Sequence, residues 1–378
     1  MEAERPLPES DAEAEQPLPE SNAEAKRPLL EVENLRTYFD TPRGILKAVD
    51  GVSFSLDRGE TIGIVGESGS GKSVLVRSIM NILTSNAIIP DGSRVIFDGK
   101  DTRNLSRSEA KHFWGTQMAM IFQDPMTSLN PVKKVGVQIT ESIRYHLGAS
   151  KQEAMERALE LMVQVGIPEP RKRLREYPHQ LSGGMRQRVT IAIALACNPK
   201  LLIADEPTTA LDVTVQKQIL DLLGSLQDEL GMAMILITHD LGVVAGRARR
   251  IGVMYAGKMV ETAGTTTLFH HMNHPYTEAL FKSIPRVEHT SHTRLDAISG
   301  RPPDMVLDLV GCRFAPRCRY AQQKCLIEEP TLFETGQSDH RQACFFPVGS
   351  PQNREALAAN QQDGVTAAGL DLHAAAVS

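Results

Sequence analysis

A glycine-rich stretch, GESGSGKS at residues 66–73, has the residue types and spacing needed to bind a phosphate chain. Its glycines let backbone N–H groups close around phosphates, and a helix that follows directs its positive dipole end at the anion. An apolar strand before the loop and helical spacing after it favour this interpretation over a chance turn. Lys72 would reach the β and γ phosphates, and Ser73 would bind Mg²⁺. The predicted nucleotide contacts in the loop are Gly66, Ser68, Gly69, Ser70, Gly71, Lys72 and Ser73.

Two further apolar strands end in side chains that could act on such a nucleotide. KLLIADEP at residues 200–207 ends in Asp205, which could complete a Mg²⁺ shell, and Glu206, which could polarise water. His239 follows the strand MAMILITHD at residues 232–240 and could contact a γ-phosphate and position the attacking water. Taken alone, the Asp-Glu pair could be a solvated strand end and the histidine could be structural. Their place after neighbouring strands favours the catalytic interpretation.

Two more motifs could take part in binding a nucleotide, one of them at a different site. Gln123 ends another apolar run, and its amide oxygen could join the metal shell, although alone it is only a polar residue entering a turn. In LSGGMRQR, residues 181–188, Ser182 is placed to cap a helix, so Ser182, Gly183 and Gly184 form a second anion site or simply a tight turn. Because one loop already holds the triphosphate, we interpret this helix end as serving a nucleotide bound to another subunit.

The elements that must position these residues indicate an α/β fold. Strands alternate with helices, which predicts a parallel sheet covered on both faces. Residues 30–60 alternate apolar and polar side chains, as antiparallel strands do, and a mainly helical subdomain is expected at about residues 124–190. Within it, Ser150 and Glu153 have the spacing of a capping box.

Composition limits the remaining possibilities. The 378 residues carry a formal net charge of −5, which gives no reason to expect nucleic acid as the main partner. No apolar run approaches the roughly 20 residues of a membrane-spanning helix, and we expect no secretory signal. Residues 1–28 contain near-copies of an eleven-residue Pro/Glu/Ala-rich repeat and are predicted to be disordered, while residues 349–378 are predicted to form a flexible tail.

Four of the five cysteines cluster near the C-terminus, with the spacing C-x5-C-x6-C-x18-C. Cys312, Cys318, Cys325 and Cys344 suit a 4Fe–4S cluster or tetrahedral Zn²⁺, since both accept four thiolates. The spacing does not choose between the metals, and the residues could instead be small buried hydrophobes, as we expect of Cys197.

Together, these motifs resemble the ATP-binding-cassette (ABC) ATPases over about residues 29–265. The resemblance rests on GESGSGKS, the Gln123 loop, LSGGMRQR, LLIADEP, the ALD at residues 210–212 and His239, all in the family's order. It implies a head-to-tail dimer in which the phosphate loop of one subunit and Ser182, Gly183 and Gly184 of the other enclose each ATP. One departure is Met185, where many members have Gln; backbone donors are unaffected, so we expect little loss.

The same resemblance implies roles for individual residues. Glu206 would be the general base, with Lys72 and His239 also catalytic, and Asp212 would couple the two ATP sites. An aromatic residue upstream of the phosphate loop would stack on adenine; Tyr38 and Phe39 are the candidates, and Phe39 is preferred.

The C-terminal segment resembles the extension of ATPases from dipeptide, oligopeptide and nickel importers. HPYTEALFKSIP at residues 274–285 and the cysteines carry this resemblance, which implies a small accessory domain at residues 266–348 and favours iron–sulfur over zinc. It also implies a peripheral location on the cytoplasmic face of the cell membrane. The implied partners are two transmembrane permease subunits, an extracytoplasmic substrate-binding protein and a second ATPase, either a paralogue or another copy.

Two other classes of function remain as alternatives. A soluble ABC ATPase acting on DNA or ribosomes usually has tandem cassettes, long coiled coils or basic faces, which this sequence lacks. A metal-sensing regulator built on the cysteines would not need an intact Glu206 and His239. Peptide import is therefore the preferred function, with import of a nickel chelate as its nearest alternative.

Overall fold

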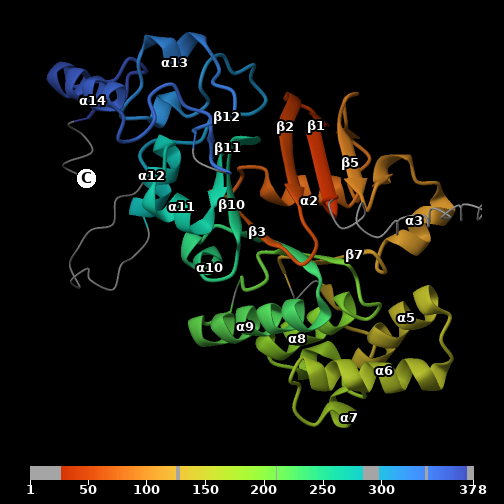
Figure 1. Cartoon of the computed structure of the whole chain (residues 1–378). Coiled ribbons are helices and arrows are strands. Elements are labelled where there is room, and N and C mark those ends of the chain that lie inside the picture. Colours follow the sequence, from red (N-terminus) through yellow and green to blue (C-terminus); the bar gives the residue numbers. More distant parts are fainter. Residues whose placement is uncertain (1–26, 125–127, 210, 284–297, 337–338, 373–378) are drawn as a thin grey trace, which may run out of the picture.

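The computed structural model describes residues 27–124, 128–209, 211–283, 298–336 and 339–372. The predicted disorder of residues 1–28 therefore falls almost wholly outside the described residues. Within them, the chain forms two sheets with helices beside them (Figure 1).

The larger sheet has eight strands in the order β12-β13-β11-β10-β3-β9-β8-β7. Five neighbouring strands of this sheet run parallel, as the alternation of strands and helices predicted. Every residue of β3, β8 and β9 is buried, which is usual for parallel strands covered on both faces. The parallel strands are β3 (Thr61–Val65), β7 (Met118–Ile121), β8 (Leu201–Asp205), β9 (Ala233–Thr238) and β10 (Arg250–Tyr255). The strands beyond β10 are antiparallel: β11 (Lys258–Gly264), β12 (Phe333–Glu334) and β13 (Arg341–Gln342).

The smaller sheet is the antiparallel unit predicted near the N-terminus, in the order β2-β1-β5-β6 with β4 also paired to β1. Helix α2 (Lys72–Ile79) packs between the two sheets, and its Leu75, Val76 and Ile79 are fully buried. Because α2 begins at the phosphate loop, this packing fixes the direction in which the loop points. The strands are β1 (Leu30–Thr41), β2 (Gly44–Leu56), β4 (Ala87–Ile88), β5 (Arg94–Phe97) and β6 (Lys100–Asp101).

Helices lie beside the sheets and at the lower end of the molecule as drawn (Figure 1). Residues 135–194 form the predicted helical subdomain, and Ser150 and Glu153 close the predicted capping box at the start of α6. The helices up to β11 are α3 (Arg107–Phe113), α5 (Val135–Leu147), α6 (Lys151–Gln164), α7 (Pro170–Arg173), α8 (Gly183–Ala194), α9 (Val213–Leu230) and α10 (Leu241–Ala245), with the 3-10 turns η1 (Thr102–Asn104) and η2 (Pro178–Gln180).

The described residues of the C-terminal region share a core with the main sheet. Phe314, Cys318 and Tyr320 belong to the same buried apolar cluster as Tyr255 of β10, and β13 pairs with β11, so the region extends the main sheet. The sequence analysis expected a small accessory domain at residues 266–348; its described residues are joined to the cassette by this strand pairing and this shared core. Its helices are α11 (Thr265–His270), α12 (Pro275–Lys282), η3 (Ala315–Arg317), α13 (Gln323–Ile327) and α14 (Pro351–Asp363).

The prediction that residues 349–378 form a flexible tail is wrong for the part that the structure describes. Helix α14 packs on the C-terminal region through buried polar side chains. Asn360 donates from Nδ2 to the carbonyl oxygens of Arg319 (2.9 Å) and Ala321 (3.1 Å), and its Oδ1 accepts from Gln322 (2.9 Å). Sequence patterning missed this helix because it is held by hydrogen bonds rather than by an apolar stripe.

We expect Asn360→Ala to lower the free energy of unfolding by about 2 kcal/mol, since it leaves buried carbonyl and amide groups without their donor and acceptor. Urea unfolding of the full chain measures the change. Gln361→Ala, at an exposed position on the same helix, is the matched control and should have little effect. Equal stability of the two variants would show that α14 is not docked.

Candidate functional site

The phosphate loop lies against the backbones of both sheets. Gly66 has φ 155° and Gly71 has φ 103°, and these left-handed values favour glycine. A Cβ at Gly66 would lie 2.2 Å from the carbonyl oxygen of Met254 in β10, and one at Gly71 would lie 2.3 Å from that of Ala48 in β2. Only glycine fits at these two positions, so the loop backbone stays open to an anion in front of it.

Lys72 is buried at the base of the loop. Its Nζ donates to the carbonyl oxygens of Gly66 (2.7 Å) and Glu67 (3.0 Å). Burial lowers the pKa of Lys72, while the nearby carboxylates of Glu206 and Asp205 favour its charged form. The structure thus places a lysine ammonium directly over the loop, where phosphate oxygens would replace the carbonyls as its acceptors.

Ser73 and Asp205 meet where a magnesium ion would be needed. Ser73 Oγ donates to Asp205 Oδ1 at 3.0 Å, although the two residues are 132 positions apart in the chain. Asp205 Oδ2 is buried and has no hydrogen-bond donor among the described residues, and burial raises the pKa of this carboxyl. A hard cation that prefers oxygen ligands would satisfy this atom and stabilise the carboxylate. The pair therefore fits the predicted Mg²⁺ ligands.

Glu206 has an unusual backbone and a crowded carboxylate. Its φ of 46° lies in the left-handed region, where a non-glycine residue persists only if its surroundings hold it. Its N–H donates to the carbonyl of Ile237 in β9 at 3.0 Å. Gln123 Nε2 (2.9 Å) and Thr209 Oγ1 (3.1 Å) donate to Oε2, while His239 Nδ1 lies 3.4 Å from Oε1.

The ends of β7, β8 and β9 thus bring Gln123, Glu206 and His239 together, as the strand pattern predicted. Gln123 contacts Glu206 through its amide nitrogen, and its predicted role as a metal ligand stays a prediction. Thr209 was missed by the sequence analysis; its only signal was its position three residues after Glu206, in the turn that closes over the carboxylate. The side chain of His239 is 62% exposed, so its ring can reach a bound molecule.

The second glycine pair opens α8 as expected. Ser182 Oγ accepts from the N–H of Met185 at 3.3 Å, which confirms the predicted cap, and Ser182 is exposed. A Cβ at Gly184 would lie 2.9 Å from Val215 Cγ1, so this turn packs directly on the start of α9. There, Asp212 Oδ1 accepts from Val215 N–H at 2.9 Å. The two helix starts form one exposed edge.

The two candidate adenine contacts have different surroundings. Tyr38 Oη donates to Asp50 Oδ1 at 2.7 Å, and Arg313 of the C-terminal region holds the other oxygen of Asp50. Burial and the neighbouring Asp50 raise the pKa of Tyr38 to about 12. Phe39 has no polar group to engage and is half-buried on β1. These surroundings leave Phe39 as the preferred candidate, and its contact with adenine stays a prediction.

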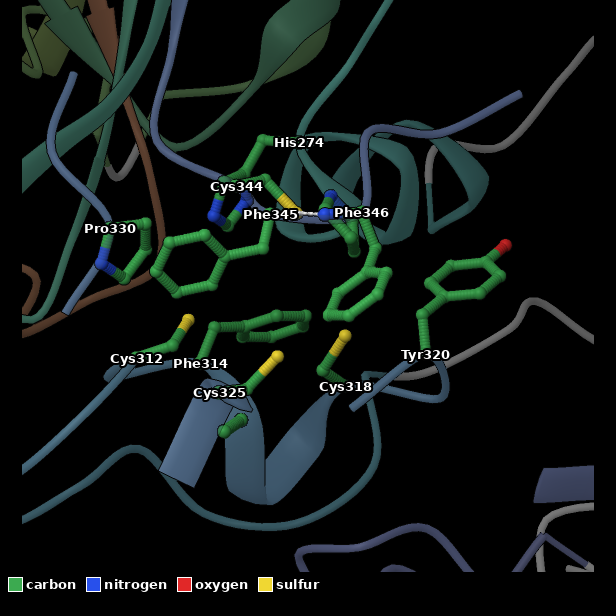
Figure 2. A pocket seen from close by; sticks show the side chains of 12 residues that line it. His274, Cys312, Phe314, Cys318, Tyr320, Cys325, Pro330, Cys344, Phe345 and Phe346 are labelled. Carbon is green, nitrogen blue, oxygen red and sulfur yellow. Dashed lines mark hydrogen bonds between the residues drawn. The ribbon is translucent and has the colours of Figure 1, made fainter. Parts of the chain in front are cut away.

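The four C-terminal cysteines line one pocket with Phe314, Phe345 and Phe346 (Figure 2). Burial raises the pKa of Cys312 to about 11 and also raises the pKa values of the other three thiols. The Sγ of Cys344 accepts a hydrogen bond from the backbone N–H of Phe346, two residues later, at 3.4 Å.

Such N–H donors stabilise thiolates in metal and iron–sulfur sites. Even so, no group of three or more His, Cys, Asp or Glu side chains within the described residues is arranged to hold a metal ion. The structure therefore shows a common pocket and one such donor, and the ligation predicted for these cysteines is not established by it. Cys197 is buried alone, as expected, with its Sγ 3.9 Å from the carbonyl oxygen of Ser142.

Comparison with known proteins agrees with this geometry. The family model described as "ABC transporter" matches residues 49–209, and the one described as "Oligopeptide/dipeptide transporter, C-terminal region" matches residues 260–325. The oligopeptide transport ATP-binding protein OppD of Bacillus subtilis is 48% identical over 85% of this chain and 90% of its own length. The dipeptide transport ATP-binding protein DppD of Escherichia coli is 48% identical over 84% of this chain and 97% of its own length.

Among solved structures, an ATP-binding cassette described as a dimer in a post-hydrolysis state with ADP and Pi has a TM-score of 0.56 and 28% identity. The match covers 62% of this chain and 98% of that cassette. The family predicted from the motifs is confirmed. The chain belongs to the ABC ATPases, in the branch formed by the ATP-binding proteins of oligopeptide and dipeptide transporters.

Proposed function

We propose that this chain hydrolyses ATP to power the import of dipeptides or oligopeptides across the cell membrane. The observation that carries the proposal is the similarity to peptide transport ATP-binding proteins, which continues from the cassette through the C-terminal region. The site supports it, since Lys72, Asp205 and Glu206 are all present and lie at one edge of the sheet.

In the proposed reaction, Glu206 is the general base. Its carboxylate takes a proton from a water molecule, which attacks the γ-phosphorus while the bond from that phosphorus to the β-γ bridging oxygen breaks. His239, 3.4 Å from the same carboxylate, orients the water and the γ-phosphate. Lys72 binds the phosphate oxygens. Ser73 and Asp205 would hold Mg²⁺, which would neutralise charge on the phosphates.

In the proposed dimer, the second anion site of one subunit completes the ATP site of the other. Ser182 and Asp212 are both exposed, and Gly183 and Gly184 leave the N-terminus of α8 open. An isolated phosphate loop leaves one side of its ligand in water, and a second subunit can supply this helix end to that side. The solved cassette described as a dimer with ADP and Pi supports such an arrangement. The partner is a second ATPase, either a paralogue or another copy of this chain.

The membrane partners bind next to Gln123 in this proposal. Phe122, Val132 and Val137 are exposed apolar side chains at the start of the helical subdomain, with Val132 80% exposed. Apolar surface of this kind suits docking of two transmembrane permease subunits, to which an extracytoplasmic substrate-binding protein delivers the peptide. Among the described residues, no helix is long and apolar enough to cross a bilayer. We place the chain peripherally, on the cytoplasmic face of the cell membrane.

The cysteine pocket holds a 4Fe–4S cluster in this proposal, with Zn²⁺ as the alternative. Cys312, Cys318, Cys325 and Cys344 would be its ligands, and a bound cluster would keep their sulfurs as thiolates despite the burial that raises their pKa values. The backbone N–H of Phe346, directed at the sulfur of Cys344, supports a ligated thiolate over a buried neutral thiol there. Its role is structural, because ATP-driven import transfers no electrons.

We expect Glu206→Gln to lower ATP turnover by about 100-fold or more, because an amide cannot accept the proton from water. ATP affinity should be retained, since the amide keeps the size of the carboxylate and one acceptor oxygen for Gln123 and Thr209. Phosphate release and equilibrium nucleotide binding measure the two effects. Glu156→Gln, on the exposed side of α6, is the control. Unchanged turnover in Glu206→Gln would defeat the assignment of the base.

We expect anaerobic purification of the native complex to yield two membrane subunits, a second ATPase and about four irons per cluster. Reconstituted with its binding protein, the complex should take up peptides only with ATP. Cys344→Ser should lose the iron, whereas Cys197→Ser should keep it. Zinc in place of iron would refute the cluster. Recovery of the chain alone or on nucleic acid would refute the importer.

A further inference from the structure

The C-terminal region is hydrogen-bonded to a side chain of the phosphate loop. Glu67, the second residue of the loop, accepts two hydrogen bonds from Arg317, from Nη1 to Oε2 at 2.6 Å and from Nη2 to Oε1 at 3.0 Å. The Arg317 side chain is 3% exposed and that of Glu67 is 28% exposed. Paired, charge-assisted bonds of this type fix orientation as well as position. Residues 250 positions apart are thus joined at the ATP site.

The backbone of the same residue is held as well. Tyr276, in the HPY segment, is fully buried, and its Oη accepts from the N–H of Glu67 at 2.7 Å. The ring of Tyr255 packs on Tyr276 with a centroid distance of 4.5 Å, and its hydroxyl lies 3.4 Å from Arg317 Nη1. The carbonyl of Glu67 accepts from Lys72, so the C-terminal region is one residue away from the lysine that binds phosphate.

Arg317 lies in the turn between two cysteines of the pocket. It ends η3, the turn that joins Cys312 to Cys318, in which Ala315 N–H donates to Cys312 O (3.0 Å) and Cys318 N–H donates to Ala315 O (3.1 Å). Both cysteine side chains line the pocket, so the turn has one end at each of two pocket residues. Arg317 projects from its end toward the phosphate loop, and its Nε donates to Ser299 O at 2.9 Å.

We propose that Arg317 is a positioning residue of the ATP site, which holds Glu67 and through it the phosphate loop, and that the turn between Cys312 and Cys318 keeps it in place. The proposal rests on the ATPase function given above and adds a route by which the cysteine pocket affects nucleotide affinity. Two physical effects act together. Arg317 fixes the loop in one conformation, and it neutralises a carboxylate that would repel the phosphate chain.

The first test is equilibrium binding of the non-hydrolysable analogue AMP-PNP with Mg²⁺ to the full chain. We expect Arg317→Met to raise the Kd about tenfold, a coupling of ordinary size between two sites. Arg317→Lys should recover part of this loss because it keeps the charge. In the assembled transporter, Arg317→Met should raise the KM for ATP and change kcat less than about twofold, since the contact acts on binding.

The matched control is Arg319→Met, on the other side of Cys318. Arg319 is exposed and its guanidinium lies over the ring of Tyr320 rather than at the loop, so its replacement should leave the Kd unchanged. Iron content and thermal midpoint are measured on both variants. A fall of both values in Arg317→Met alone, with KM and kcat affected equally, would mean a purely structural role and overturn the proposal.

A double-mutant cycle tests the contact itself. Removing Arg317 leaves the Glu67 carboxylate unpaired beside the phosphates, so Glu67→Gln added to Arg317→Met should restore affinity to near that of Glu67→Gln alone. Additive losses would show that the two residues act independently and would overturn the proposal. An unchanged Kd in Arg317→Met would do the same, while leaving ATP hydrolysis and peptide uptake by the unmodified complex as separate readouts.

A further experiment tests whether the cysteine pocket affects nucleotide binding. Cys318→Ser should raise the Kd for AMP-PNP in the same direction as Arg317→Met, and the two changes together should be no worse than either alone. Cys197→Ser is the control and should bind like the unmodified chain. A Cys318→Ser chain that loses its iron yet binds AMP-PNP normally would overturn the link between pocket and loop.

Discussion

The site depends on one steric constraint, the close approach of the phosphate loop to two carbonyl oxygens. Gly66 meets the backbone of β10 and Gly71 meets that of β2, at distances that leave no room for a Cβ. The loop is therefore anchored to the parallel sheet and to the antiparallel sheet at once. Helix α2 starts from this anchored loop and fills the space between the sheets. As a result, Lys72 and Ser73 point toward the edge at which β7, β8 and β9 end.

Electrostatics at that edge opposes folding and favours a ligand. Lys72 and Asp205 are both buried, and burial disfavours the charged form of each. Each also favours the other's charge, and Glu206 likewise favours the charged form of Lys72. An unpaired Asp205 oxygen and an ammonium held only by backbone carbonyls are groups that a metal-nucleotide complex can satisfy. These buried polar groups are therefore better satisfied when the metal-nucleotide complex is bound than when the site is empty.

The residues that could be predicted from sequence are those with local signals. The phosphate loop, the carboxylates after β8, the caps at Ser150 and Ser182 and the alternation of strands and helices each depend on neighbours within a few positions. Long-range contacts could not be predicted this way. Three examples are the pair of Arg317 and Glu67, the docking of α14 through Asn360 and the pairing of β13 with β11. In each, neither the residue types nor their spacing in the sequence indicate that the two segments meet. Thr209 is an intermediate case, since the sequence indicated its place in a turn but did not indicate that its hydroxyl donates to Glu206.

The two short strands β12 and β13 have a further consequence. β13 pairs with Glu261 and Thr262 of β11, and so covers what would otherwise be the outer edge of the main sheet. The new edge, β12, is only two residues long. Short edge strands offer few free N–H and C=O groups to another chain, whereas an uncovered β11 would present a row of them. The C-terminal region therefore protects the sheet from edge-to-edge aggregation, and a cassette cut out after β11 would be prone to self-association.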